Sequence, residues 1–354
     1  MRLKRIISIV TIVCIFLASI LSLFSCTLGK SKEKFTKIYL EYFDTVTNAI
    51  VYAESQEDAD CIFSLIESRL RSYHELFDIY NSYEGITNLH DVNLMSAEER
   101  VSIKVDARIA DLLEFSRTAY EMTEGYTNVC LGSVLKLWHD KRELALNGGN
   151  AELPDASALL AASAHTDIGY LTVNKAESLL CITDPYLMLD VGAVAKGYAT
   201  EMIALELESL GYSGFALSVG GNVRVIGDKP DGSPWSIGVE DPFLSGGYIE
   251  TLSLSDKALV TSGSYQRFYK IDGVSYHHII DKDTLYPANE GFVSVSVVAE
   301  SSAVADALST ALFCMSADSG LAIVERISGV EAIWITDSGE RITSSGFNAL
   351  VKNG

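Results

Sequence analysis

The stretch that decides the fold runs from Leu187 to Asn222 and reads LMLDVGAVAKGYATEMIALELESLGYSGFALSVGGN. Its apolar runs and turn residues predict a short strand ending at Asp190, a helix from Lys196 to a stop at Gly211, and a strand over residues 215–219. The stretch therefore reads as a strand, helix, strand unit with a candidate site at the strand ends. Free backbone N–H groups and one ammonium at the start of the helix suit an anionic ligand such as phosphate.

Two consecutive glycines, Gly220 and Gly221, follow the second predicted strand. Glycine lets a ligand approach the backbone closely, so the pair is consistent with a binding site. Taken alone, the pair indicates only a tight turn, and Lys196 is then an ordinary surface residue.

The remaining pattern predicts an α+β fold, a single large domain with a mainly antiparallel sheet and packed helices. Helices are expected over 55–77 and 129–146 and after Asp106, Asp155 and Ser301, and strands over 37–52, 170–182, 235–271 and 293–298. Residues 77–93 are polar and rich in turn formers, so they are expected to form a loop. There is no internal repeat.

The first 25 residues differ from the rest of the chain. Three basic residues precede an apolar run that ends in LFSC, whose last residue is Cys26. This pattern is typical of a bacterial lipoprotein signal. We expect a signal peptide over 1–25, a lipidated Cys26 with a polar tether over 26–35, and a domain over 36–354, anchored by lipid to the extracytoplasmic face of the cell membrane. An uncleaved transmembrane anchor is the alternative, because the run is nearly long enough to span a bilayer.

Composition and charge argue for a folded domain and against a nucleic-acid-binding protein. The chain has 354 residues, 48% of them hydrophobic, which is enough for a sizeable core, and its net charge is −20. Such acidity argues against binding to nucleic acid, and a phosphate ligand needs local basic groups or a divalent cation. The body cysteines have no C-x-x-C spacing, so each is most simply a buried thiol, with a disulfide between two of them as the alternative: Cys61, Cys130, Cys181 and Cys314.

Further motifs accompany the central stretch. They are DxGxxAKGYA at 190–199, GGN at 220–222, TSGxYxRF at 261–268, HHIIDxxT at 277–284, ADALSTAL at 305–312 and GYTNVCLGSVLKLW at 125–138. Together they resemble the ApbE-like FAD:protein FMN transferases over nearly the whole chain beyond residue 35. The resemblance implies the ApbE fold and transfer of FMN from FAD to a Ser or Thr of a target protein, with release of AMP.

The resemblance also implies which residues contact the flavin nucleotide. They are Phe43, Tyr80, Tyr126, Thr127, Asn128, Asp190, Lys196, Gly220, Gly221, His278 and Ile280. Phe43 stands where a Met is usual in the family. Asn128 keeps the hydrogen-bonding shape of the usual Asp but not its charge.

A metal site is predicted on the helix after Ser301. Asp306 and Thr310 are spaced i, i+4, so their oxygens share one face. A carboxylate and a hydroxyl are hard ligands that suit Mg²⁺, and the resemblance adds the backbone carbonyl of Ala193. Without the resemblance, Asp306 more simply favours the helix N-terminus. Ser309 stands where some relatives carry another Asp.

His277 and His278 follow one another on a predicted strand, so their imidazoles are expected on opposite faces. The resemblance favours His278 as the residue in the site, where an imidazole can shuttle a proton. Asp281 is expected to orient His278 or a neighbouring loop. The residues that follow read DKDTL in place of the family's DPxTG.

The implied mechanism places Mg²⁺ on the FAD pyrophosphate, with Lys196 neutralising charge and an acceptor hydroxyl attacking the FMN phosphorus. His278, Asp306 and Lys196 are the expected catalytic residues. Acceptors in the family include membrane subunits of redox-driven ion pumps. Two alternatives stay open: an FAD pyrophosphatase with water as acceptor, and a flavin- or solute-binding lipoprotein without turnover.

Overall fold

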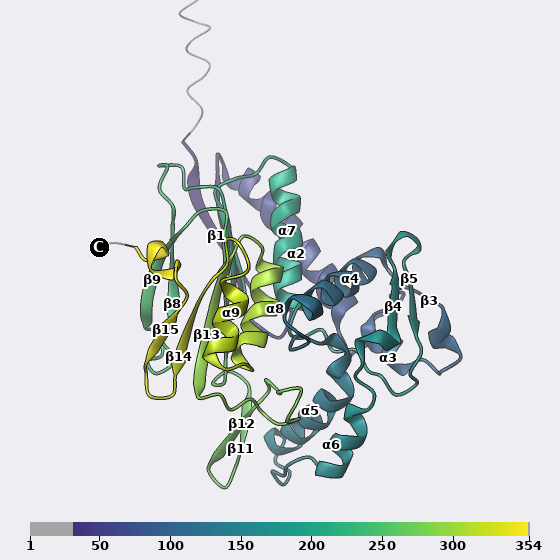
Figure 1. The fold of residues 1–354 in the computed structure, drawn as a ribbon. Coiled ribbons are helices and arrows are strands. Elements are labelled where there is room, and N and C mark those ends of the chain that lie inside the picture. Colours follow the sequence, from purple (N-terminus) through teal and green to yellow (C-terminus); the bar gives the residue numbers. More distant parts are fainter. Residues whose placement is uncertain (1–30, 353–354) are drawn as a thin grey trace, which may run out of the picture.

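The computed structural model describes residues 31–352, and its eight-stranded antiparallel sheet lies in the left half of the molecule in Figure 1. The strand order is β1-β2-β6-β7-β10-β13-β14-β15. These strands are β1 Glu33–Tyr39, β2 Thr47–Ala53, β6 Phe215–Val219, β7 Asn222–Ile226, β10 Ala258–Gly263, β13 Phe292–Ala299, β14 Glu331–Thr336 and β15 Arg341–Thr343. The predicted leader and Cys26 lie outside the described residues.

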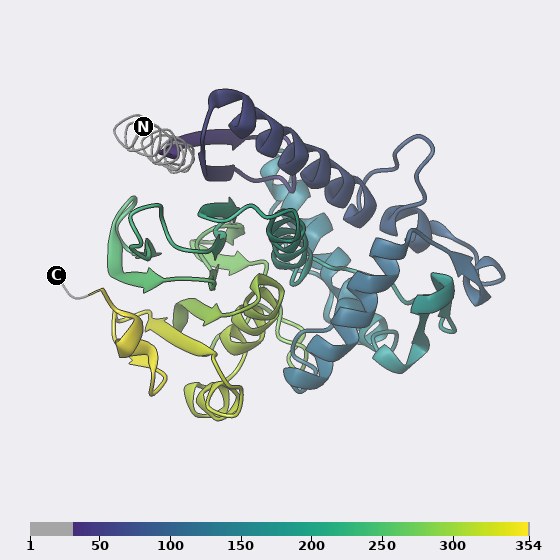
Figure 2. The same cartoon turned by 90° about the horizontal axis from the view of Figure 1, so that it is seen from above.

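Helices cover one face of this sheet, and α7 and α8 lie side by side on its central strands (Figures 1 and 2). The helices are α2 Gln56–Phe77, α3 Leu89–Leu94, α4 Ala107–Met122, α5 Gly132–Leu146, α6 Ala156–Ser163, α7 Ala195–Ser209, α8 Ser302–Phe313 and α9 Ala317–Val324. The hairpin of β8 (Trp235–Glu240) and β9 (Tyr248–Leu254) packs on the opposite face through a separate apolar cluster. The sheet is therefore buried on both sides.

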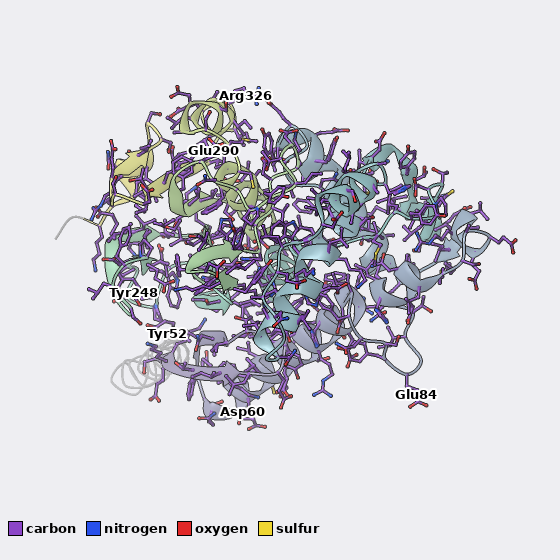
Figure 3. The ribbon with its side chains drawn as sticks, turned by 90° about the horizontal axis from the view of Figure 1, so that it is seen from below. Tyr52, Asp60, Glu84, Tyr248, Glu290 and Arg326 are labelled. Carbon is purple, nitrogen blue, oxygen red and sulfur yellow. The ribbon has the colours of Figure 1, made fainter. Side chains whose placement is uncertain are left out.

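Helices α3 to α6 and a three-stranded sheet form the other side of the molecule (Figure 1). The strands of this sheet are β3 Ile103–Lys104, β4 Leu171–Asn174 and β5 Leu179–Ile182, and a further hairpin joins β11 Phe268–Ile271 to β12 Val274–His277. Figure 3 shows Glu84, in the loop after α2, and Tyr248, at the start of β9, at opposite ends of the molecule. The fold is the predicted α+β domain with a mainly antiparallel sheet.

The predicted helix starts are confirmed, because each expected N-cap side chain accepts a backbone N–H of the first turn. Ser55 accepts from Asp58, Asp106 from Arg108, Asp155 from Ser157 and Ala158, and Ser301 from Val304. Gly211 has φ +86°, a conformation that suits glycine, and α7 ends just before it. Local chemistry therefore sets these boundaries.

The strand predicted before Asp190 was wrong. Leu187 and Leu189 are buried as expected, but this segment belongs to no sheet. Side chains satisfy its backbone instead: Asn93 bonds both the N–H and the C=O of Leu189, at 2.8 and 2.9 Å, and Arg100 donates to the Leu187 carbonyl at 2.7 Å. An apolar run therefore packs here without pairing as a strand.

The loop predicted over residues 77–93 was also wrong in part, because α3 begins within it. Asn88 and Asp91 form a capping box in which each side chain accepts the other's backbone N–H. Asn88 is fully buried, and its amide also donates to the carbonyls of Glu75 and Asn81. These long-range bonds stabilise a short helix in a sequence that otherwise reads as a turn.

Two further expectations concern the thiols and the membrane. The four cysteines within residues 31–352 are unpaired, and Cys61 is exposed, so the prediction of a buried thiol was wrong there. Cys130 and Cys314 are buried and Cys181 is half-buried. Across the described part of the chain, no helix combines the length and apolarity needed to cross a bilayer.

Candidate functional site

The starts of α7 and α8 meet at a contact between Gly197 and Asp306. The Gly197 N–H donates to Asp306 Oδ2 at 2.7 Å. A Cβ on Gly197 would lie 2.3 Å from the Asp306 Cβ and 2.5 Å from the Ser302 carbonyl oxygen, so only glycine fits without moving a helix. This close approach brings Lys196 and Asp306, which are 110 positions apart in the chain, into one site.

We expect Gly197→Ala to separate α7 from α8. Because the new Cβ meets backbone as well as side chain, the cost should reach about 3 kcal/mol, measured by chemical denaturation, with loss of the site's activity. Gly192→Ala, in the turn just before α7, is the control, since its Cβ would meet only Asp190 Oδ1, at 3.1 Å. Equal behaviour of the two variants would show that the α7–α8 contact is not what the site depends on.

Oxygen atoms from three segments gather at this contact. Asp306 is buried, and burial raises the pKa of its carboxyl, while the charge of Lys196 and the Gly197 N–H oppose that shift. The Ala193 carbonyl, one turn earlier, accepts no hydrogen bond from the described residues, because the Gly197 N–H donates to Asp306 instead. Thr310 Oγ1 lies 3.4 Å from Ser262 Oγ of β10.

These oxygens are mostly not carboxylates. Residues 31–352 contain no group of three or more His, Cys, Asp or Glu side chains placed to hold a metal ion. The candidate set instead combines one carboxylate, one hydroxyl and one main-chain carbonyl.

The turn between β6 and β7 borders the site. Gly220 and Gly221 have φ of +58° and +90°, and a Cβ on Gly220 would lie 2.6 Å from Thr45 Oγ1, whereas Gly221 has no atom within 4 Å of that position. Asn222 follows, buried, and its Nδ2 makes no well-formed hydrogen bond within the described residues, although the amide helps to favour the Asp306 carboxylate. The glycine pair is thus both a tight turn and an open edge of the site.

Basic side chains surround the neighbouring His278. Burial first, and then the charges of Arg267 and Lys196 with a smaller contribution from Arg142, lower the pKa of His278 to about 3. Arg142 and Arg267 also act on Asp190, whose pKa is raised by its burial. A chain of net charge −20 therefore concentrates cations here, as a phosphate ligand requires.

Hydrogen bonding fixes the tautomer of His278. Its Nδ1 lies 3.2 Å from the Arg267 carbonyl, which only accepts, so Nδ1 carries the proton and Nε2 of the neutral ring is an acceptor. The strand ends at His277, so His278 lies just beyond β12 and the expected alternation does not extend to it. His277 faces elsewhere, with Nε2 3.0 Å from the Ala288 carbonyl and its ring edge-on to Phe313.

An aromatic stack forms another wall. The rings of Tyr80 and His139 lie 4.5 Å apart at 21°, and Arg142 Nη2 lies 3.0 Å from His139 Nδ1. Tyr80 is still half exposed, so one side of the stack is open. Both Tyr80 and Asp190 lie within range of the Arg142 and Arg267 charges.

Comparison with known proteins decides the family. The model described as ApbE family matches residues 43–334. The chain belongs to the ApbE family. It is 33% identical to an FAD:protein FMN transferase of Vibrio cholerae over 72% of this chain and 74% of the relative.

Solved structures of the ApbE family have the same fold. The ApbE protein of Thermotoga maritima matches with a TM-score of 0.77 and 26% identity, over 91% of this chain and 100% of that one. The flavin transferase ApbE of Vibrio cholerae matches with a TM-score of 0.75 and 26% identity, over 90% and 99%.

Some of the residues expected to contact FAD instead form hydrogen bonds within the protein, around the candidate site. Thr127 Oγ1 donates to the Ala307 carbonyl of α8 at 2.6 Å, and Asn128 Nδ2 donates to the Thr166 carbonyl at 2.9 Å. Asn128 Oδ1 also accepts the Cys130 N–H. The amide of Asn128 thus both donates and accepts a hydrogen bond, whereas a carboxylate in its place could only accept.

The aromatic and apolar candidates are placed as follows. Phe43 has φ +57° and packs edge-on against His74, with its N–H on His74 Nδ1 at 3.2 Å. The Lys282 ammonium lies 4.4 Å above the Tyr126 ring, and Ile280 is buried in the apolar cluster around Trp138.

Asp281 orients the adjoining loop and not His278. Its carboxylate accepts the N–H groups of Asp283 and Thr284, at 3.1 and 2.7 Å. This Asx turn gives the loop a fixed start without the family's Pro and Gly, and Leu285 takes the positive φ of +64° near where the family has glycine.

The sequence interpretation missed Arg142, Arg267 and His139. Arg267 lies inside the TSGxYxRF motif, so its position was a usable signal. His139 and Arg142 follow Trp138 on α5, and only the packing of α5 against the β11–β12 hairpin shows which way they face.

Proposed function

We propose that this chain transfers FMN from FAD to a Ser or Thr hydroxyl of a target protein and releases AMP. The observation that carries the proposal is the position of Lys196, whose charge acts both on the buried Asp306 and on His278, which also lies beside Arg267. Cations and a proton acceptor in one place suit attack of a hydroxyl on a pyrophosphate. The names of the relatives support the same reaction.

Each group has a role that follows from its position. Lys196, Arg142 and Arg267 offer positive charge to the pyrophosphate, where charge develops during transfer. His278 Nε2 is free to accept the proton of the attacking hydroxyl, because Nδ1 is held on the Arg267 carbonyl. The open side of the Tyr80–His139 stack suits a planar ring of the dinucleotide.

The donor set fits a magnesium ion. Asp306, Thr310 and the Ala193 carbonyl, which accepts no hydrogen bond from residues 31–352, are hard oxygen donors. A set of only three protein ligands suits an ion that keeps waters and substrate phosphates in its other positions. We propose that these three hold Mg²⁺, which when bound would neutralise charge on the pyrophosphate.

The test is incubation of the purified protein with FAD, Mg²⁺ and an acceptor domain, followed by intact mass and nucleotide analysis. Protein-linked FMN together with AMP is the expected result. Free FMN with AMP would instead establish a pyrophosphatase, and unchanged FAD a binding protein without turnover. The mass of an acceptor co-expressed with and without this chain extends the test to cells.

We also propose that a lipid on Cys26 anchors the protein to the extracytoplasmic face of the membrane, beside membrane-bound acceptors. The support is the charged, apolar and LFSC pattern of the leader. Cys26→Ser is expected to lose the acyl mass and, because cleavage of this kind of signal depends on the lipidated Cys, to keep the full-length leader, as judged by mass spectrometry. Wild-type protein of full-length mass without acyl groups would establish the transmembrane anchor instead.

A further inference from the structure

A buried ion pair lies directly beneath the candidate site. Arg224 Nε of β7 lies 3.2 Å from Glu201 Oε2 of α7, and both residues are 5% exposed. The same Glu201 oxygen accepts the N–H of Ser302, the first residue of α8, at 2.6 Å. Arg224 Nη1 donates to the Val225 carbonyl at 2.7 Å. The pair thus joins α7, β7 and α8 at one point.

The same three elements, α7, α8 and β7, meet at two successive levels. At the level of the site the residues are Gly197, Asp306 and Asn222, and one helical turn away they are Glu201, Ser302 and Arg224. The two levels differ by four residues on each helix and by two on the strand. Four helical residues rise about 6 Å and two strand residues about 6.7 Å, so the levels are in register.

Ion pairing in this place does more than stabilise the fold. A buried ion pair adds little net stability over an apolar pair, but removal of one partner leaves the other charge uncompensated. Glu201 also accepts a first-turn N–H that α8 cannot satisfy by itself, and a carboxylate is favoured at a helix N-terminus. The position of the α8 start therefore depends on the Glu201 charge.

We propose that Glu201 is a positioning residue for Asp306. Through the Ser302 N–H it fixes the start of α8, one turn before Asp306, and Arg224 fixes Glu201 in turn. The inference rests on the proposed function, in which Asp306 holds Mg²⁺. Residues that orient a metal ligand typically contribute 10- to 100-fold in metal affinity.

The test is the Mg²⁺ dissociation constant of the FAD-free protein, measured by calorimetry, together with kcat and KM for FAD. Glu201→Gln should weaken Mg²⁺ binding by about 10-fold or more and lower kcat, with KM for FAD little changed. Glu206→Gln is the matched control on the same helix, because Glu206 pairs with Arg69 of α2, at 2.6 Å, and not with α8. It should leave both Mg²⁺ binding and kcat within about two-fold.

Glu201→Asp covers the case in which Glu201→Gln does not fold. It keeps the charge opposite Arg224 but withdraws the carboxylate by about 1.5 Å, one carbon–carbon bond, from the Ser302 N–H. A smaller loss of Mg²⁺ affinity, about three-fold or more, is expected. If the Asp variant, or a folded Gln variant, binds Mg²⁺ as the wild type does, Glu201 has only a structural role. Wild-type protein that neither binds Mg²⁺ nor transfers FMN would overturn the proposed function instead.

Discussion

Asp306→Asn is expected to reduce FMN transfer by at least about 10³-fold while leaving the protein folded. Asparagine keeps the shape of the side chain and an oxygen for the Gly197 N–H, but it removes the one carboxylate of the candidate metal site. The loss should appear in kcat, measured as AMP released per enzyme under saturating FAD. EDTA should reduce wild-type turnover in the same way, and added Mg²⁺ should restore the wild type but not the variant.

A control variant and an EDTA experiment decide this prediction. Asp337→Asn removes an exposed carboxylate from the turn after β14 and should leave turnover unchanged, so a general effect of charge is controlled. Turnover of Asp306→Asn at the wild-type rate, or a wild type indifferent to EDTA, would exclude the metal site.

Asp306→Asn should also raise the melting temperature of the metal-free protein by a few degrees. Burial raises the pKa of Asp306 above its value in the unfolded chain, so the metal-free folded state disfavours the ionised carboxylate, and stability falls once the pH exceeds the unfolded-state pKa. A neutral amide of the same shape avoids that cost, as is common where function conflicts with stability. An excess of Mg²⁺ should reverse the order by stabilising the wild type alone.

His278→Ala is expected to lower kcat by about 10²- to 10⁴-fold, with a small change in KM for FAD. The reason is the tautomer: the Arg267 carbonyl holds the proton on Nδ1 and leaves Nε2 to accept the proton of the attacking hydroxyl. His277→Gln is the internal comparison. His277 faces Ala288 and Phe313, so this change should lower the melting temperature more than it lowers kcat. Equal losses of kcat in both variants would argue against a specific role for His278.

The pH dependence of stability gives an independent test of the His278 environment. The unfolded chain protonates this imidazole as pH falls below 6.5, whereas the folded protein resists until about pH 3. The unfolded state therefore binds more protons in that window, and stability is lost as pH falls. His278→Ala removes this contribution, so its melting temperature should fall less steeply than that of the wild type between those values. Parallel curves would show that the ring is freely solvated.

Local sequence determined the helices and their limits. Ser55, Asp106 and Ser301 satisfy N–H groups within three residues of themselves, and Gly211 ends α7 because it adopts a positive φ without steric cost. The i, i+4 spacing placed Asp306 and Thr310 on one face for the same reason: helical geometry is fixed by the backbone. The spaced motifs identified the family, and the comparisons confirm it.

Only the tertiary structure decided which distant groups meet. Leu187 to Leu189 reads as a strand, yet side chains of Asn93 and Arg100 satisfy its backbone from about 90 positions away. Arg142 comes to the site because α5 packs on the β11–β12 hairpin, and Glu201 reaches Ser302 because Gly197 lets two helices touch. Such contacts depend on shape and on unsatisfied polar groups across the whole fold, and no periodicity within a short window encodes them.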